Sequence, residues 1–317
     1  MDLKTLTEIN APSGHEQAIR RFLLDELKKL GFAPVLDRMG NVVVVKEGTG
    51  DAPRKRVMVS AHMDEVGLIV TSATEDGYLR IAAAGGIDPR VLVSKRVTVG
   101  EDKLPGVIGA VPIHLQSAAE RKHVLSMDEL LVDIGAKNKD EAECKAPMGT
   151  YISFDTPYVE YGDGFACGKA FDDRVGCLSL LRLLQEELPV DLVACFVSEE
   201  EVGCRGAKGA AFQQEPDIGI VLEGTTCNDL GDVPETAHVC EAGHGVAVSF
   251  MDGASIANRA LFRKALDVAK QENIPHQVKH SVSGGNDGGA IQRAREGVPV
   301  VALSVPCRYI HSPSSVV

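Results

Sequence analysis

Short apolar runs alternate with helical patterns at the start of the chain and again through its second half. Helices are predicted over 3–30, 173–186 and 257–272, where apolar residues recur at helical spacing, and Ser13 followed by Glu16 has the spacing of a capping box. Buried strands are predicted wherever a short apolar or β-branched run is bounded by turn residues, at 41–45, 56–62, 191–197, 218–222 and 298–305. This alternation is typical of an α/β fold.

The pattern changes between residues 68 and 164. Strand-like runs separated by Gly, Pro and Asp turns occur at 68–70, 78–81, 96–99, 106–111 and 151–154, with one weak helical pattern at 137–143. The sequence therefore predicts a discontinuous α/β domain, residues 1–67 and 165–317, into which a small β-rich domain, residues 68–164, is inserted. The chain stops soon after its last predicted strand, and we expect a final helix to be missing from this sequence.

Composition excludes several classes of protein. The 317 residues are 44% hydrophobic and 25% charged, which is ordinary for a globular protein. A net charge of −12 makes nucleic acid and anionic membranes poor partners. No run approaches the ~18 apolar residues of a membrane span, and no basic segment followed by an apolar one opens the chain, so we expect a cytoplasmic location. Eight scattered cysteines without a Cys-x-x-Cys pair suggest neither a disulfide framework nor a zinc knuckle.

Candidate chemistry gathers at the ends of the predicted strands. His62 and Asp64 lie two apart and share a face, and further acidic groups and a histidine border other apolar elements: Asp172-Asp173, Glu199-Glu200-Glu201, Glu223 and His311. Taken singly, these are explained by a structural histidine, a helix N-cap and a solvated face. Together they supply two histidines and at least three carboxylates, and burying such carboxylates is costly unless cations neutralise them.

This inventory suits a two-metal hydrolase, in which the ions activate a water and stabilise an oxyanion. Mixed histidine and carboxylate ligation favours zinc, cobalt or manganese over calcium. A spare carboxylate is also needed, to take the proton of the water and deliver it to the leaving amine, and consecutive glutamates can provide both a ligand and this base.

Five segments resemble motifs of the M42 metalloaminopeptidases, the glutamyl and leucyl aminopeptidase relatives that include the tetrahedral peptidases. They occur in the family's order, and the similarity runs from Thr5 to the last residue: Ala-His62-Met-Asp64-Glu65-Val-Gly, Lys169-Ala-Phe-Asp172-Asp173-Arg174-Val-Gly, Glu200-Glu201-Val-Gly-Cys-Arg-Gly-Ala, Gly284-Gly-Asn-Asp287-Gly-Gly-Ala-Ile and Tyr309-Ile-His311-Ser-Pro.

The resemblance implies a mixed-sheet α/β catalytic domain with an inserted β-barrel-like dimerisation domain. It also implies two divalent ions per subunit, removal of N-terminal residues from short peptides, and dimers that can gather into a dodecamer. By position, His62 would bind one ion, Asp172 would bridge both, and His311 would bind the second. Asp64 would orient His62, and a cis peptide would join Asp172 to Asp173.

The glutamate triplet has two alignments with the family. Anchoring on Val202-Gly203 makes Glu200 the general base and Glu201 a metal ligand, whereas a one-residue slip would name Glu199 and Glu200 instead. Glu223 stands where many members have Asp and would be a further ligand. The loop Gly284–Gly289 lacks the Lys and Ser/Thr of a phosphate-binding loop, and we expect it to line the active site.

Two other functions stay open. Some members of the family carry endoglucanase labels, although glycosidases need two carboxylates at a sugar ring and usually no metal. A non-catalytic metal-binding assembly protein is the third candidate, since metal ligation alone can support folding and oligomer formation. The side-chain preference at the cleaved residue is open too.

Overall fold

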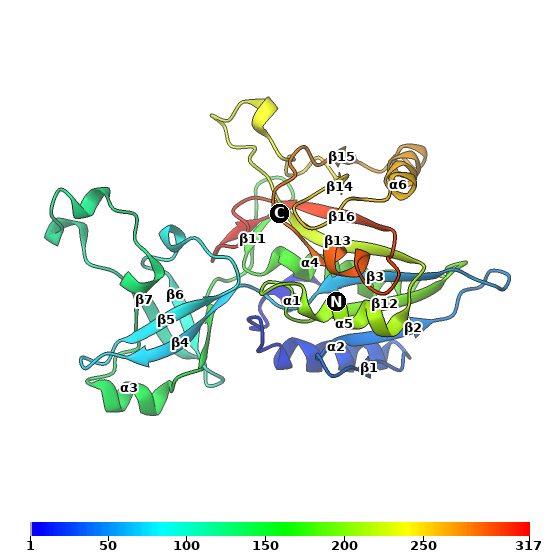
Figure 1. The fold of residues 1–317 in the computed structure, drawn as a ribbon. Helices are drawn as coiled ribbons and strands as arrows, with labels where there is room; N and C mark the ends of the chain where they lie inside the picture. Colours follow the sequence, from blue (N-terminus) through cyan, green and yellow to red (C-terminus); the bar gives the residue numbers. More distant parts are fainter. Residues whose placement is uncertain (1) are drawn as a thin grey trace.

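The computed structural model describes residues 2–317 and is built around one large mixed sheet with a separate small barrel beside it (Figure 1). The four central strands of the sheet run parallel, and antiparallel pairings join the outer strands to them. In sheet order the eight strands are β1 (Val35–Leu36), β2 (Val42–Lys46), β12 (Asp191–Val197), β3 (Arg56–His62), β13 (Ile218–Thr226), β16 (Val300–Cys307), β14 (Val246–Ser249) and β15 (His276–Val278).

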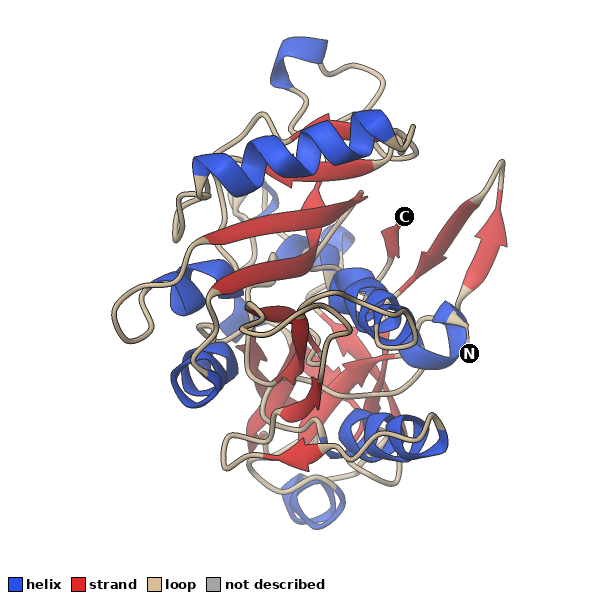
Figure 2. Ribbon diagram, turned by 90° about the vertical axis from the view of Figure 1, so that its right-hand side faces the viewer, coloured by secondary structure: helices blue, strands red, loops and turns tan. Residues whose placement is uncertain are grey.

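Helices cover both faces of this sheet (Figure 2). The side chains of β2 and β3 alternate between two apolar clusters, so neighbouring valines such as Val42 and Val43 face opposite layers. One cluster packs against α2 (Gln17–Lys29) and α4 (Phe171–Leu183), with α1 (Leu3–Thr7) beside them. The other packs against α5 (Arg205–Gln214) and α7 (Asp287–Gln292), and α6 (Arg259–Gln271) lies next to β14 and β15.

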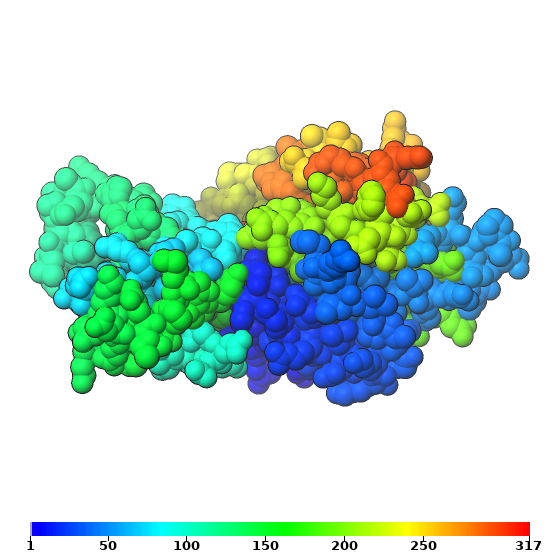
Figure 3. All heavy atoms as spheres, turned by 60° about the horizontal axis from the view of Figure 1, so that its bottom comes forward, coloured from blue at the N-terminus to red at the C-terminus, as the bar shows by residue number. Residues whose placement is uncertain are grey.

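The barrel has its own apolar core and projects from one side of the molecule (Figure 3). Its strands close in the order β4 (Gly67–Ala73), β5 (Leu79–Ala84), β8 (Leu131–Asp133), β7 (Leu104–Gly109), β6 (Arg96–Val99) and β9 (Tyr151–Phe154). Helix α3 (Lys139–Lys145) packs beside β4. A small sheet joins β10 (Val159–Tyr161), β11 (Phe165–Gly168) and β17 (Ser315–Val316). Short 3-10 helices occupy Pro89–Val91, Ile113–Leu115, Glu120–Lys122, Met127–Glu129 and Glu235–Ala237.

The predicted fold class is confirmed: a mixed α/β sheet accompanies a closed six-stranded barrel. The five sheet strands predicted from the sequence occur within a few residues of their expected bounds, and strands β8, β14 and β15 were not predicted. The continuous helix over 3–30 is wrong, because Pro12 and Gly14 separate two helices. The capping box is wrong too, since the Ser13 hydroxyl donates to Asp64, 51 positions away, and the helix begins only at Gln17.

Among residues 2–317, no helix combines the length and the apolar character that a membrane span requires.

Candidate active site

The candidate site lies at the carboxyl ends of three adjacent parallel strands. Strand β3 ends at His62, which is paired in register with Val197 at the end of β12, and the glutamate triplet follows β12 directly. On the other side of β3, strand β13 carries Glu223 near its carboxyl end. Parallel strands bring their carboxyl ends to one edge of a sheet, where ligands bind in open α/β folds. Three sequence-distant segments therefore meet there.

His62 is the centre of the site. Its side chain is 1% exposed, and Nε2 lies 3.1 Å from Asp172 Oδ1 and 3.1 Å from Glu223 Oε1. Nδ1 lies 3.1 Å from the backbone oxygen of Asp64. An Nδ1–H that donates to this carbonyl leaves the Nε2 lone pair directed at the carboxylates, as a metal ligand requires. Burial alone would lower the pKa of His62, but the charges of Glu223 and Asp172 raise it well above the ordinary value.

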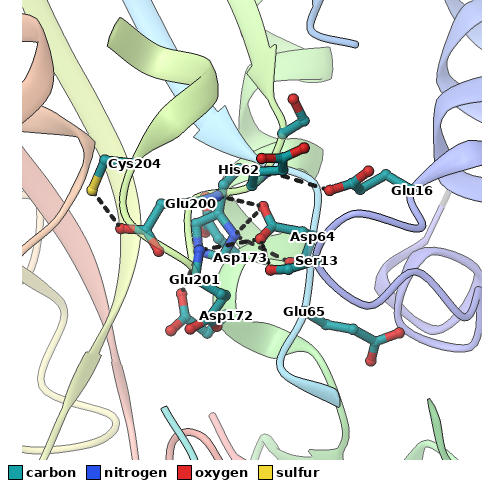
Figure 4. A network of polar contacts seen from close by, with 12 residues as sticks. Ser13, Glu16, His62, Asp64, Glu65, Asp172, Asp173, Glu200, Glu201 and Cys204 are labelled. Atoms are coloured by element: carbon teal, nitrogen blue, oxygen red, sulfur yellow. Dashed lines mark hydrogen bonds and ion pairs between the residues drawn. The ribbon is translucent and has the colours of Figure 1, made fainter. Parts of the chain in front are cut away.

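Asp64 ties the end of β3 to the glutamate triplet (Figure 4). Its carboxylate accepts hydrogen bonds from the backbone N–H of Glu200 at 3.0 Å and of Glu201 at 3.1 Å, and from the Ser13 hydroxyl. It also lies 3.5 Å from His62 Nδ1. Although burial raises the pKa of a carboxyl, these contacts hold the pKa of Asp64 below its ordinary value. Asp64 is therefore a fixed anion that orients its neighbours.

A second histidine approaches the same carboxylate from the other side. Asp172 directs Oδ1 toward His62, and its Oδ2 lies 3.4 Å from His311 Nε2. His311 Nε2 is also 3.3 Å from Glu201 Oε2. Burial and the nearby charges of Asp172 and Glu200 raise the pKa of Glu201 to about 8. The peptide bond between Asp172 and Asp173 is cis, as the family resemblance implies.

The residues present fit divalent cations. Two overlapping sets of ligand atoms, each within 4.8 Å of one another, consist of His62 with Asp173 and Glu223, and of His62 with Asp172 and Glu201. The buried oxygens Asp173 Oδ2 and Glu223 Oε2 have no hydrogen-bond partner. Buried carboxylates in this number must be neutralised by protons or by cations. Imidazole and carboxylate donors together suit zinc, cobalt or manganese.

A cavity of about 150 Å³ opens at this cluster. Carboxylates and His311 form one wall, and the opposite wall carries Thr225, Thr226, Lys279 and the loop Ser283–Asn286. The predicted role of the loop beginning at Gly284 as a lining of the site is thus confirmed for its first part. Glu200 lines this cavity, whereas the carboxylate of Glu199 turns to Arg205, 3.3 Å away.

All the residues singled out from the sequence meet at this edge of the sheet: His62, Asp64, Asp172, Glu200, Glu201, Glu223 and His311. Sequence reasoning missed Ser13, Asp173 as a carboxylate of the cluster, Lys279 and Asp287. Asp173 and Asp287 lie inside recognised motifs, so their acidic character was the available signal. Nothing around Ser13 or Lys279 in the sequence marks either one as part of a site.

Comparison with other proteins places the chain in one family. The M42 glutamyl aminopeptidase family matches residues 40–317. The glutamyl aminopeptidase of Lactococcus lactis is 34% identical over 326 residues, which cover 99% of this chain and 90% of that protein. The lysyl aminopeptidase of Pyrococcus furiosus is 33% identical over 321 residues, which cover 98% of this chain and 89% of that protein.

Solved structures agree with this placement. An aminopeptidase from the archaeon Desulfurococcus kamchatkensis has a TM-score of 0.93 at 33% identity, over 99% of this chain and 88% of that one. The TET1 peptidase of Pyrococcus horikoshii, described as assembling into a tetrahedron or a large octahedral shell, has a TM-score of 0.86 at 33% identity, with 99% and 93% covered. A Thermotoga maritima structure described as an endoglucanase has a TM-score of 0.80 at 33% identity, with 100% and 91% covered. The chain belongs to the M42 glutamyl aminopeptidase family.

Proposed function

We propose that this protein is a dinuclear metalloaminopeptidase that removes N-terminal residues from short peptides, with Glu200 as the general base. The observation that supports this most is the position of Asp172, which directs one carboxylate oxygen to each of the two histidines, His62 and His311. A carboxylate placed in this way is suited to bridge two cations. Glu200 lies on the wall of the adjoining cavity.

Five residues would hold the ions. His62 and Glu223 would bind one, His311 and Glu201 the other, and Asp172 both. When bound, a pair of divalent ions supplies Lewis acidity and a water that is readily deprotonated. Asp64 would act by positioning, because it holds His62 and the backbone of the glutamate turn without facing the cavity itself.

Glu200 is suited to move a proton. Burial and the charges of Asp172 and Asp64 raise the pKa of Glu200, against the lowering effect of His62. A carboxylate of raised pKa accepts a proton more readily, and the protonated form can then donate to the leaving amine. Both transfers take place at the Glu200 carboxylate, on the cavity wall beside the scissile bond.

The cavity is suited to the end of a peptide rather than to a folded chain. Its volume of about 150 Å³ is sufficient for one terminal residue. The free amino group of the substrate is a cation and would be attracted to the acidic wall. The nature of the opposite wall, with Lys279, would decide which first residue is preferred.

We also propose that the subunits assemble through the barrel. The segment between β7 and β8 exposes a row of apolar side chains, namely Val111, Ile113, Leu115 and Val124, each at least 60% exposed. Exposed apolar patches of this kind mark interaction surfaces. Assembly in solved relatives such as the TET1 peptidase supports the same inference.

The test is hydrolysis of aminoacyl-nitroanilides by metal-stripped protein reloaded with zinc, cobalt or manganese. Release that requires metal is expected. Glu200→Gln should keep the bound metal and lose about 10²–10⁴-fold in turnover, the usual contribution of a general base. Glu199→Gln is the matched control, because its carboxylate faces Arg205, and it should retain most turnover. Normal activity in Glu200→Gln would overturn the assignment, and the Glu199 register would then be the alternative.

Endoglucanase activity is the second candidate, because a Thermotoga maritima structure that is 33% identical carries that description. Cellulose is therefore included as a substrate in the same assay. Glycosidases usually need no metal, so hydrolysis of cellulose that survives a chelator would favour this alternative over peptide hydrolysis.

A further inference from the structure

We propose that Glu200, Cys204 and Asp287 form a separate binding site for one thiophilic divalent cation such as zinc, and that an ion bound there inhibits the enzyme. This site shares only Glu200 with the residues assigned to catalysis above. The binding of the ion does not depend on the proposed function, whereas the inhibition rests on the proposed role of Glu200.

The three side chains converge from two separate segments. Cys204 Sγ lies 3.3 Å from Glu200 Oε1, and one ligand atom from each of Glu200, Cys204 and Asp287 lies within 4.8 Å of the others. Figure 4 shows Cys204 on the side of Glu200 away from His62. Tetrahedral zinc needs ligand atoms roughly 3.3–3.8 Å apart, by the geometry of its usual bond lengths. Small side-chain rotations are enough to reach that geometry.

Asp287 is the observation that points to a ligand. The residue is 1% exposed, and neither of its two carboxylate oxygens has a hydrogen-bond partner. A buried carboxylate without partners is costly, and in this site the neighbours are another carboxylate and a thiol. The thiol has a single proton and directs it to Glu200. The cluster therefore has an excess of negative charge for which a cation is the direct remedy.

The donor set indicates which cation is bound. Calcium and magnesium prefer oxygen ligands alone, whereas a thiolate with carboxylates suits zinc or cobalt. Three protein ligands would leave a fourth position for water. The catalytic ligands proposed above include no cysteine, so a thiolate bond to metal would be diagnostic of this second site.

An ion has a route to the cluster that does not pass through the substrate cavity. A second cavity, of about 740 Å³, lies on the other side of the glutamate turn and is lined by Cys204, Gly203 and Asn286. The substrate cavity also touches Glu200 and Asn286 but not Cys204. An ion that enters from the larger cavity would reach Cys204 first and then engage the carboxylate of Glu200. A carboxylate bound to that ion cannot accept the proton of the water, so turnover would stop.

The experiment is a cobalt titration of protein already loaded with two equivalents of cobalt per subunit, followed by near-ultraviolet absorption. A thiolate-to-cobalt charge-transfer band should grow with the third equivalent. Cys204→Ala should abolish the band, and Asp287→Asn should weaken binding of the third ion by about tenfold or more. Cys144→Ala removes an exposed thiol elsewhere and should behave as the unchanged protein.

Excess zinc provides the second measurement. Activity should fall with the same midpoint as third-ion binding, and the midpoint in Cys204→Ala, taken relative to its own uninhibited rate, should rise by about tenfold or more. Absence of the band in the unchanged protein, or a band that persists in Cys204→Ala, would overturn the proposal and leave a proton shared between Glu200 and Asp287 as the explanation. If the protein binds the third ion with a thiolate band but hydrolyses no aminoacyl substrate, the proposed function fails and the binding site stands.

Discussion

Asp64 shows how one residue can position several others. It contacts the ring of His62, the hydroxyl of Ser13 and the backbone of both Glu200 and Glu201. A carboxylate with this many donors loses little by being buried, because each contact replaces one that water would make. The cost of placing an anion in the core is thereby turned into the orientation of a ligand and of a base at once.

Lys279 gives a prediction about specificity. The residue is 7% exposed, lines the substrate cavity opposite the carboxylates, and donates to the backbone oxygen of Ser283 at 3.3 Å. Within residues 2–317, no carboxylate forms an ion pair with it. A buried ammonium in that position is suited to pair with an acidic first residue of the substrate. A hydrogen bond to a charged group contributes about 1.5–3 kcal/mol, or roughly 10–100-fold.

We therefore expect Lys279→Met to lower kcat/KM for glutamyl and aspartyl substrates by roughly 10–100-fold relative to leucyl substrates. The measurement is the ratio of the two rates, which cancels any general loss of active protein. Lys208→Met, an exposed lysine on α5, is the control and should leave the ratio unchanged. An unchanged ratio in Lys279→Met would mean that the preference is set elsewhere.

At the scale of elements, the start of α5 is packed against the strand that precedes it. A Cβ at Gly206 would lie 2.3 Å from Asn41 Oδ1 and 2.3 Å from the backbone oxygen of Ser198, so neither neighbour could make room easily. At Gly209, one turn later in the same helix, the nearest atom would be Met39 Cγ at 3.4 Å, which is ordinary contact. The two glycines therefore differ in packing although they share a helix.

Gly206→Ala should destabilise the protein by about 1–3 kcal/mol through overpacking, and Gly209→Ala should stabilise it by about 0.4–1 kcal/mol through a smaller loss of backbone entropy. Denaturant unfolding of the two variants in the same metal state measures both. Equal effects of the same sign at the two positions would show that helix propensity, and not the contact with Asn41 and Ser198, determines the outcome.

The elements that carry the site could be predicted because each is a short apolar run with a polar end. Strands β3 and β12 were correct to the residue, and both deliver site residues where the run stops. The segment around Ser13 could not be predicted, because its hydroxyl has a choice between a local cap and Asp64, and only the folded chain brings Asp64 near. The contact between Cys204 and Asp287 depends likewise on how α5 and α7 pack together.

At the scale of the whole molecule, the ionisation of the site couples stability to pH and metal. In the folded state the pKa of Glu201 is raised from 4.5 to about 8, and that of His311 from 6.5 to about 9. Between these values the folded protein holds more protons than the unfolded chain, so its stability falls as the pH rises. The lowered pKa of Asp172 adds stability that is already complete at the acidic end of this window.

Metal-free protein should therefore lose thermal stability as the pH rises from about 6 to about 9, and metal-loaded protein should show a flatter dependence, because cations replace the protons. Thermal unfolding at a series of pH values, with and without zinc, measures this. Glu201→Gln should flatten the profile of the metal-free protein. A metal-free protein that becomes more stable with rising pH would contradict the proton count.

The last prediction concerns assembly. The barrel is an independent core on one side of the molecule, and its long segment between β7 and β8 carries exposed apolar side chains that no other part of the subunit covers: Val111, Ile113, Leu115 and Val124. Burying an apolar side chain of this size in an interface contributes about 1.5–3 kcal/mol, so several of them on each subunit are enough to affect association strongly. A charge introduced among them must either remain in water or be buried unpaired, and both outcomes oppose association. Ile113→Asp should therefore shift the protein to a smaller mass in light scattering, whereas Val35→Asp, at an equally exposed position on the edge strand β1, should not. If both variants keep the mass of the unchanged protein, the subunits meet through another surface, and the barrel must serve the active site rather than the assembly.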